Sequence, residues 1–489
     1  MVRTARRRVS ASPFGPFLFR PRPPEVFVAM GSDGSGVNWE TFCGEVGALR
    51  DAIQTLAPTE WVLNFEDSYH FAVAFCAALA ADKSVLIPGN ARPEAVAALA
   101  NPRRGCLFDG RRPARFCVSL SLPNPGAAKG TRTFAIASVE SPRITLLTSG
   151  STGRPKAVLK SLANLLTEVA ALESAWGDQL TGVRMVSTVS HRHIYGLLFR
   201  VLWPLCAGRP FQRHSLLFPE QVLAEANVNA ALVASPATLQ RISKSASAPY
   251  RAIFSSGGAL SPDAAAASLQ HLGRLPTEIF GSTETGGIAW RRQANPDEPW
   301  TLFPGVRAKI GKDSALLVHS RYVTPSGWIA TGDAVRLLGN RQFVWLGRID
   351  RIVKIAEKRV SLAEVEKHLA RLDWVREAAA LPLGPADKTV LGAALVLTPA
   401  GQALRAKRGP GQFRLQIRRE LRHWLEPAAV PRRFREVPTL PVNAQGKLVQ
   451  EELRALFEPR FESSPASHLP PDPRELAQSG SRRKRKEPT

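Results

Sequence analysis

The stretch Thr148–Lys156, with the sequence TSGSTGRPK, decides how the rest of the chain is interpreted. It follows the short apolar run Ile144–Leu147 and precedes apolar residues at helical spacing, so we predict a strand, a loop and a helix in that order. Small and hydroxylated residues let backbone N–H groups approach phosphate oxygens, and Lys156 adds a positive charge. The glycine-to-lysine spacing is not that of a Walker A loop. Taken alone, such a loop is also a common turn.

Apolar segments and helical patterns alternate on both sides of this loop, from Val26 to beyond residue 300. We predict a helix at 39–56 and a buried helix at 71–81. Such alternation is typical of a layered α/β domain. Residues 334–347 are predicted to form a hairpin that turns at Gly339-Asn340, which gives this domain a β-rich subregion near its end.

The pattern changes after Arg348 to a mixed α+β type. Ser361 and Glu364 form a predicted capping box before a helix, and Ala393–Leu397 is typical of a buried strand. A further helix is marked by apolar residues at helical spacing, namely Ile417, Leu421 and Trp424. These features predict a small second domain.

The fold class we predict is α/β: a large N-terminal layered α/β domain with a β-rich subregion, followed by a small mobile α+β domain. The expected parts are a disordered basic N-terminus (1–24), a large domain (25–348), a small C-terminal domain (349–460) and a disordered basic tail (461–489). The two ends are assigned to disorder because they are rich in Arg and Pro or in Pro and Ser.

The composition fits a soluble protein. Apolar residues make up 44% of the chain, but no apolar run approaches the ~20 residues of a membrane-spanning helix. The five cysteines are odd in number and lack paired short spacing, which argues against a disulfide framework or a zinc site and favours the reducing cytoplasm. The Arg-rich N-terminus lacks the pattern of a secretory signal, and a start at Met30 stays open.

The net charge of +24 is not confined to the ends. Residues 1–24 carry +6 and residues 461–489 carry +2, which leaves +16 for the body of the protein. A basic body attracts anionic partners such as ATP, coenzyme A, an acidic carrier protein or nucleic acid. An ordinary arginine-rich surface is the equally acceptable alternative.

Four further motifs follow the loop in order: Phe280-Gly281-Ser282-Thr283-Glu284, Thr331-Gly332-Asp333, Gly347-Arg348-Ile349-Asp350 and a segment from Pro441 to Gly446-Lys447. With the loop, they resemble the motifs of the adenylate-forming superfamily of acyl-CoA synthetases, non-ribosomal adenylation domains and luciferases. The resemblance covers roughly Pro23 to Leu456. It implies an enzyme, an AMP-forming acid–thiol ligase that uses ATP and Mg²⁺, with coenzyme A or phosphopantetheine as the thiol acceptor.

The resemblance implies a role for each motif. Lys447 would contact the carboxylate and the α-phosphate, Thr283 would touch the α-phosphate, and Glu284 would hold Mg²⁺. The nucleotide would also contact a larger set, namely Thr148, Ser149, Gly150, Ser151, Thr152, Gly153, Lys156, Phe280 against the adenine, Gly281, and Asp333 with Arg348 on the ribose. Taken alone, Asp333 could close a turn and Arg348 could form a surface ion pair. Charged groups suit the reaction, because it brings two anions together.

Two positions concern movement of the small domain. The resemblance implies that Asp350 is the hinge and that Arg359 contacts the nucleotide from the small domain. Where the family usually has a glycine, thought to let the pantetheine arm pass close to the backbone, this chain has Glu357. This departure puts the details of the thiol step in question, but not the adenylation step.

The segment Ser190–Gly196 corresponds to the family segment that lines the acyl pocket. Relatives that activate amino acids place an Asp there to pair with the α-ammonium group, and this segment has none, which favours a plain aliphatic or aromatic acid. His193 would gate the pocket, although a purely structural role for it stays open. The wall between the acyl group and adenine would include Gly257, Gly258 and Ala259.

Three stretches, 190–196, 280–290 and 357–361, resemble the stand-alone ligases of aryl polyene and xanthomonadin-type pigment pathways, which are thought to load an aromatic acid onto an acyl carrier protein. We therefore expect a hydroxybenzoate- or cinnamate-like substrate and an acidic carrier protein or coenzyme A as partner. A medium- or long-chain fatty acid ligase is the alternative enzyme. A non-catalytic nucleic-acid-binding or scaffold protein is the alternative from another class, but the retained Lys156, Glu284, Asp333 and Lys447 argue against it.

Overall fold

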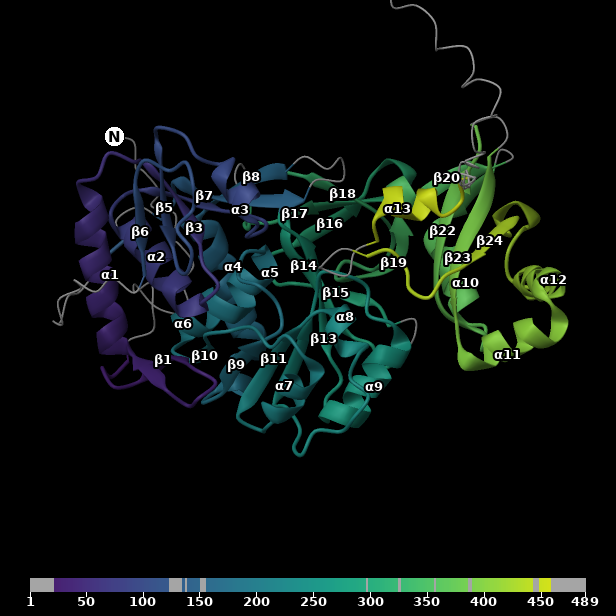
Figure 1. Ribbon diagram of the computed structural model, residues 1–489, viewed down its shortest axis with the longest axis horizontal. Coiled ribbons are helices and arrows are strands. Elements are labelled where there is room, and N and C mark those ends of the chain that lie inside the picture. Colours follow the sequence, from purple (N-terminus) through teal and green to yellow (C-terminus); the bar gives the residue numbers. More distant parts are fainter. Residues whose placement is uncertain are drawn as a thin grey trace, which may run out of the picture.

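The computed structural model describes residues 22–122, 134–136, 139–149, 155–295, 298–323, 327–355, 358–385, 389–442 and 448–458 of the 489-residue chain. Figure 1 shows a larger body, which runs from β1 to β19, and a smaller body at the right, which runs from β20 to α13. The fold is mixed α/β, as predicted from the sequence.

A six-stranded sheet in the order β6-β5-β3-β4-β7-β8 carries the Thr148–Lys156 motif. Its neighbours pair in parallel except β7 and β8, which are antiparallel. The strands are β3 (Glu60–Asn64), β4 (Ser84–Ile87), β5 (Arg104–Phe108), β6 (Ser119–Ser121), β7 (Pro142–Ser149) and β8 (Pro155–Ser161). The predicted strand–loop–helix order was therefore incomplete. A second strand, β8, precedes the helix, and its residues Lys156–Lys160 pair antiparallel with Ile144–Thr148 of β7.

Helices pack against this sheet, and their starts follow from capping side chains. They are α2 (Ser68–Ala80), α3 (Pro93–Ala97) and α4 (Leu162–Trp176), whereas α1 (Trp39–Gln54) packs against α2. The side chain of Asn38 accepts a hydrogen bond from the amide of Thr41, and Asp67 caps α2 in the same way. The helices predicted at 39–56 and 71–81 are confirmed, although α2 begins earlier because Asp67 caps it. The first is amphipathic, whereas α2 is buried along nearly its whole length.

A second sheet of 13 strands forms the rest of the larger body, in the order β16-β17-β18-β19-β15-β14-β13-β12-β11-β9-β10-β1-β2. Six neighbouring strands, β13, β12, β11, β9, β10 and β1, pair in parallel. The pairs from β13–β14 to β16–β17 at one side, and β1–β2 at the other, are antiparallel. Its members are β1 (Phe27–Met30), β2 (Gly36–Asn38), β9 (Arg184–Ser187), β10 (Phe211–Gln212), β11 (Ala230–Ala234), β12 (Ala252–Ser255), β13 (Thr277–Ser282), β14 (Gly286–Arg292), β15 (Trp300–Leu302), β16 (Arg307–Ile310), β17 (Ala315–His319), β18 (Ile329–Leu338) and β19 (Gln342–Arg348).

Short helices connect the parallel strands, namely α5 (Ile194–Gly196), a π-helix (Leu197–Leu202), α6 (Trp203–Ala207), α7 (Pro219–Ala224), α8 (Pro236–Leu239) and α9 (Pro262–Leu272). The predicted hairpin at 334–347 is confirmed as β18 and β19. Gly339 at its turn has a φ of 62°, a conformation that glycine adopts without steric cost.

The smaller body has its own hydrophobic core around Val365, Leu395 and Ile417. Its elements are β20 (Ile352–Ile355), β21 (Lys358–Ser361), α10 (Leu362–Ala370), β22 (Val375–Leu383), β23 (Val390–Leu397), α11 (Pro399–Arg408), α12 (Pro410–Leu421), β24 (Arg433–Glu436) and α13 (Gln450–Ala455). The predicted strand at 393–397 is confirmed as part of β23. Ser361 caps α10 by accepting a hydrogen bond from the amide of Glu364 at 3.3 Å.

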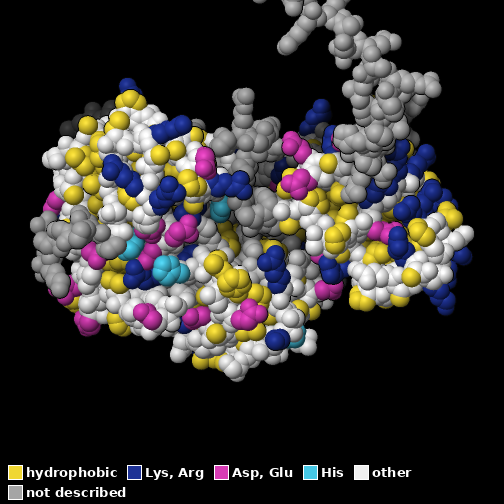
Figure 2. Space-filling view, viewed as in Figure 1, with side chains coloured by type: hydrophobic (Ala, Val, Ile, Leu, Met, Phe, Trp, Pro, Cys, Tyr) yellow, Lys and Arg dark blue, Asp and Glu magenta, His cyan; other side chains and the backbone are white. Residues whose placement is uncertain are grey.

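The helix predicted from Ile417, Leu421 and Trp424 is confirmed as α12, but Trp424 was wrongly included in it. α12 ends at Leu421, and Trp424 is 69% exposed and stacks on His368 with ring centroids 5.8 Å apart. The buried spacing continues to Leu425 instead. Figure 2 shows Lys and Arg side chains gathered on the smaller body. None of the helices among the described residues is long and apolar enough to cross a membrane.

Candidate active site

Lys156, at the start of β8, meets Glu284, which lies between β13 and β14 and is 128 positions away in the sequence. Lys156 Nζ donates a hydrogen bond to Glu284 Oε1 at 2.8 Å. Partial burial by itself would raise the pKa of the Glu284 carboxyl, but the hydrogen bond and charge of Lys156 outweigh it, so this pKa lies below its usual value. The side chains are 60% and 37% exposed, so this charged pair is open to a ligand.

Glu284 is suited to bind magnesium, because carboxylate oxygens are hard donors. No group of three or more His, Cys, Asp or Glu side chains that could hold a metal occurs in the described ranges. A metal held here would therefore take its other ligands from water and from the phosphate oxygens of ATP, as Mg²⁺ commonly does in nucleotide sites. Bound in this way, the ion would neutralise phosphate charge.

The turn that carries Thr283 and Glu284 is fixed by its own hydrogen bonds. The amide of Ser282 donates to Thr285 Oγ1 at 3.1 Å, and the amide of Thr285 donates to Ser282 Oγ at 3.2 Å. Gly281 permits the close approach of β14, because a Cβ atom there would lie 2.4 Å from the carbonyl oxygen of Gly286. The turn is thus built to hold its two half-buried side chains, Thr283 and Glu284, at one place.

Asp333 and Arg348 face each other across the paired strands β18 and β19. One Asp333 oxygen accepts a hydrogen bond from Trp345 Nε1 at 3.1 Å, and the other lies 3.7 Å from Arg348 Nη1. Arg348 Nη1 also donates to the carbonyl oxygen of Thr331 at 3.0 Å. The carboxylate is therefore anchored on one oxygen by a residue that the sequence reasoning missed, Trp345.

Phe280, which the sequence places against adenine, is half-buried. Its ring is tilted against Trp300 and edge-on to Phe343, with ring centroids 5.2 and 5.6 Å away.

The predicted wall between the acyl group and adenine follows β12, the strand paired with β13. β12 ends at Ser255 and leads into the exposed stretch Gly257, Gly258 and Ala259. Gly257 has a φ of 90°, and a Cβ atom there would meet no atom within 4 Å. The conformation requires glycine, and the space in front of it is open.

Two histidines near the predicted acyl pocket differ in their surroundings. His193 is half-buried and precedes the short helix α5. His191 is buried and stacks on Phe71. Its Nε2 donates a hydrogen bond to the carbonyl oxygen of Phe65 at 3.1 Å, and its Nδ1 is hydrogen-bonded with Ser68 Oγ at 2.9 Å. Burial, and then the charges of Arg200 and Arg192, hold the pKa of His191 well below its usual value. The structural histidine of this segment is therefore His191.

We expect His191 to make the protein less stable in acid. The unfolded chain binds a proton on this imidazole below about pH 6.5, but the folded chain binds it only at a lower pH, so the free energy of unfolding falls as the pH drops below about 6.5. The free energy of unfolding, measured with urea, should fall by about 1.4 kcal/mol less in His191→Gln than in the wild type when the pH is lowered from 7.5 to 5.5. The exposed His423→Gln should keep the wild-type slope, and an unchanged slope in His191→Gln would contradict the assignment.

Several predicted site residues cannot be placed. Lys447, Gly150, Ser151, Thr152, Gly153 and Glu357 lie outside the described residues, as do the side chains of Ser149, Asp350 and Arg359. Of the phosphate loop, Thr148 is described, and its hydroxyl donates to the carbonyl oxygen of Lys156 at 3.3 Å. The structure thus brings together Lys156 with Glu284 and Asp333 with Arg348.

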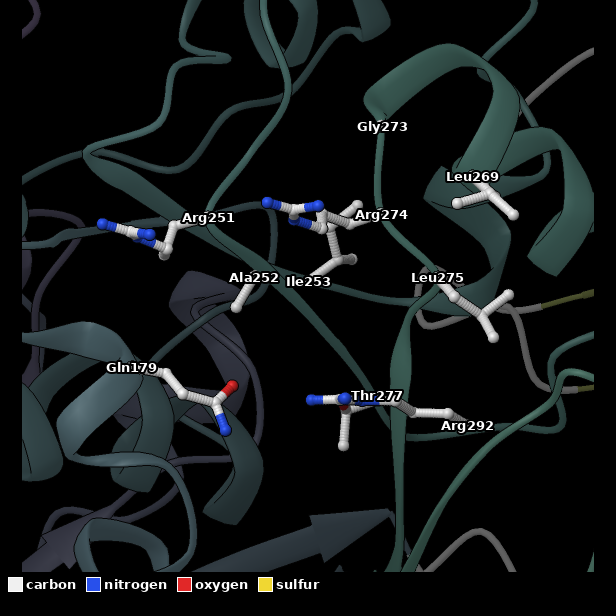
Figure 3. Close-up of a pocket in the computed structure, with 10 residues that line it drawn as sticks. All are labelled: Gln179, Arg251, Ala252, Ile253, Leu269, Gly273, Arg274, Leu275, Thr277 and Arg292. Carbon is white, nitrogen blue, oxygen red and sulfur yellow. The ribbon is translucent and has the colours of Figure 1, made fainter.

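A pocket of about 440 Å³ lies at the other end of the same strands (Figure 3). Its lining includes Arg251 and Ala252 at the start of β12, Thr277 at the start of β13, and Arg274 and Arg292. Since β13 advances roughly 3.3 Å per residue, Thr277 lies roughly 17 Å along the strand from Ser282. This pocket is therefore separate from the motif residues.

Comparison with known proteins identifies the family. The family model described as AMP-binding enzyme matches residues 71–319. The 4-coumarate–CoA ligase of Cereibacter sphaeroides is 30% identical over 312 residues, 63% of this chain and 70% of that protein.

Solved structures with a similar fold include ATP-bound MatB from Rhodopseudomonas palustris (TM-score 0.78, 18% identity, 90% of this chain and 97% of that one). Another is O-succinylbenzoate coenzyme A synthetase (MenE) from Bacillus subtilis with AMP (TM-score 0.73, 18% identity, 88% and 96%). The chain therefore belongs to the family of AMP-binding enzymes and is an AMP-forming ligase of the acid–CoA type.

Proposed function

We propose that the chain activates an aromatic carboxylic acid with ATP and passes the acyl group to a pantetheine thiol. In the first step a carboxylate oxygen bonds to the α-phosphorus of ATP, and the bond from that phosphorus to the bridging oxygen breaks, so pyrophosphate leaves. In the second step the thiol sulfur bonds to the acyl carbon, AMP leaves, and the thiol proton is released.

The contact between Lys156 and Glu284 is the observation that carries this proposal. The start of β8 and the turn between β13 and β14, which are distant in the sequence, present an ammonium group and a carboxylate 2.8 Å apart, and both side chains are partly exposed. The ammonium group would bind phosphate oxygens, and the carboxylate would bind the magnesium ion that accompanies ATP. Thr283, next to Glu284, would donate to the α-phosphate from the turn fixed by Ser282 and Thr285.

Asp333 and Arg348 would hold the ribose of the same nucleotide. The Asp333 carboxylate, which Trp345 holds at 3.1 Å, would accept hydrogen bonds from the sugar hydroxyls. Residues 349–460 would act as a mobile lid that turns about Asp350, and Lys447 would approach the acid and the α-phosphate from this lid. Arg359 would contact the nucleotide from the same side.

The aromatic acid is proposed on two grounds. Relatives named 4-coumarate–CoA ligase share 30% identity with the chain, and the segment Ser190–Gly196 holds no carboxylate that could pair with an α-ammonium group. His193 would gate the pocket. The acceptor would be coenzyme A or an acidic carrier protein, which suits the net charge of +24, and a place in aryl polyene-type pigment synthesis would fit these features.

ATP–pyrophosphate exchange tests the proposal with a panel of benzoic, hydroxybenzoic and cinnamic acids, fatty acids of 8 to 16 carbons, and amino acids. We expect the purified protein to exchange pyrophosphate at least about tenfold faster with an aromatic acid than with the others, since a misfit of about 1.4 kcal/mol already gives that factor. Exchange with amino acids only, or with none of the panel, would contradict the proposed substrate class. Faster exchange with fatty acids than with aromatic acids would show that the substrate is an aliphatic acid.

A further inference from the structure

Two opposite charges are buried behind the turn that carries Glu284. Lys160, in β8, is fully buried, and Glu168, in α4, is 5% exposed. Lys160 Nζ donates to the carbonyl oxygen of Tyr322 at 2.7 Å and to that of Glu284 at 3.3 Å. Glu168 Oε1 accepts a hydrogen bond from the amide of Gly287 at 2.6 Å. One charged group therefore contacts the main chain within the turn, and the other contacts it just after the turn, in β14.

The turn and the buried carboxylate are packed tightly together. Gly286 has a φ of 70°, and a Cβ atom there would lie 2.7 Å from Glu168 Oε2 and 2.9 Å from Tyr322 Cβ. Any side chain at this position would push the turn away from Glu168. The local sequence Thr285-Gly286-Gly287 is thus shaped to bring the main chain against this carboxylate.

Stability alone does not account for this pair. Burial lowers the pKa of Lys160 and raises that of Glu168, and each partner's charge opposes the shift. Desolvating two charges costs so much that replacing a buried pair by apolar residues of similar size is often neutral or stabilising. Both groups contact the main chain of residues 284–287, Lys160 through the carbonyl oxygen of Glu284 and Glu168 through the amide of Gly287, and Lys160 also ties this segment to the carbonyl oxygen of Tyr322. The side chain of Glu284, in this segment, is the one that contacts Lys156.

We propose that Lys160 and Glu168 are positioning residues that fix the Glu284 turn, and through it the carboxylate that receives magnesium-bound ATP. The proposal rests on the proposed function. Lys160 and Lys156 both belong to β8, so one strand positions the ammonium group that would face ATP and the support for the opposing carboxylate. A substitution that shifts this turn would therefore separate Glu284 from Lys156, although neither of these two residues is replaced.

A second buried pair on the same helix provides a matched control. Glu173, also in α4, accepts hydrogen bonds from Arg209 at 2.6 and 3.0 Å and from Trp203 Nε1 at 2.8 Å. Its side chain and that of Arg209 are 8% and 5% exposed. Trp203 lies on α6 and Arg209 lies in the loop after it, so this pair does not contact the Glu284 turn. Breaking this pair should affect folding as much as breaking the first, but not ATP binding.

The experiment compares Glu168→Gln, Lys160→Met, the double variant Lys160→Met/Glu168→Leu, and the control Glu173→Gln. The double variant leaves no unpaired buried charge, so it stays folded if a single variant does not. Isothermal titration calorimetry measures the Kd of ATP with Mg²⁺ and with EDTA, and thermal unfolding gives the Tm. Pyrophosphate exchange separates KM for ATP from KM for the acid.

We expect the folded Lys160 and Glu168 variants to bind ATP with Mg²⁺ at least about tenfold more weakly, the lower end of the effect of residues that support a metal ligand. Binding in EDTA and the KM for the acid should change less than about twofold, and Glu173→Gln should lower the Tm but leave the Kd unchanged. An unchanged Kd in the folded double variant, or an equal loss in Glu173→Gln, would overturn the proposal. A wild-type protein that binds no ATP would instead refute the proposed function.

Discussion

Replacing Lys447 with Ala is expected to lower the rate of ATP–pyrophosphate exchange about 10²–10³-fold, the usual effect of removing one preorganised donor from a developing charge. In the adenylation step an acid anion approaches a phosphate anion, and Lys447 would be the group that cancels part of their repulsion at the point of attack. The loss should appear in kcat more than in the KM for ATP, because Lys156 and Asp333 would bind the nucleotide before the lid closes.

The thiol step supplies the internal control for this variant. Attack of a thiol on a preformed acyl-adenylate brings no second phosphate charge to the acid, so Lys447→Ala should form thioester from added acyl-adenylate at a rate within about fivefold of wild type. Lys407→Ala, which removes an exposed lysine from α11, should change neither step. Undiminished exchange in Lys447→Ala would show that the predicted lysine does not act in adenylation.

The sequence was sufficient to predict the fold class and to select several residues that the structure brings into contact, because the Thr148–Lys156 and Phe280–Glu284 motifs lie where a strand ends and the chain turns. The Thr148–Lys156 stretch and the Phe280–Glu284 stretch both follow or end strands, so their side chains could be expected to gather at one place. The contacts of Lys156 with Glu284 and of Asp333 with Arg348 agree with that expectation. The hairpin at Gly339 was predicted for the same reason, a local turn signal between apolar strands.

Residues that act through long-range packing could not be predicted in this way. Trp345 gave no sign of its hydrogen bond to Asp333, since alternation along β19 shows only that a side chain faces one side of the sheet. Glu168 did carry a signal: it lies three residues after Leu165 and one before Val169, on the apolar face of α4, where a carboxylate needs a partner. The partner itself, the amide of Gly287, is 119 positions away and is fixed only by the fold.

The same limit explains the two errors in secondary structure. β8 was missed because the short segment Pro155–Ser161 contains two lysines and gives little strand signal by itself. Its formation depends on pairing with β7, a tertiary effect. Trp424 was placed inside a helix because its spacing from Leu421 and Ile417 fits a helix. The backbone leaves the helix after Leu421, and Leu425 takes the buried place.

Replacing Asp333 with Ala is expected to lower kcat/KM for ATP about 10²–10⁴-fold, since two hydrogen bonds from ribose hydroxyls to a charged group are worth ~1.5–3 kcal/mol each. The carboxylate is 7% exposed and held by Trp345 at 3.1 Å, so it is oriented before ATP binds. This preorganisation makes the loss appear in ATP binding, which we would measure as Kd by calorimetry and as KM in pyrophosphate exchange with a saturating acid.

Deoxynucleotides separate a ribose contact from damage to the β18–β19 pair. The wild-type protein should discriminate against 2′-deoxy-ATP or 3′-deoxy-ATP by at least about tenfold, and Asp333→Ala should lose that discrimination, because the partner of the missing hydroxyl is already absent. Trp345→Phe removes the donor to Asp333 but keeps the charge, so it should retain most of the discrimination while weakening binding of ATP. If a folded Asp333→Ala variant still discriminated against deoxy-ATP as strongly as the wild type, the carboxylate would serve only to stabilise the β18–β19 pair, and other residues would bind the ribose.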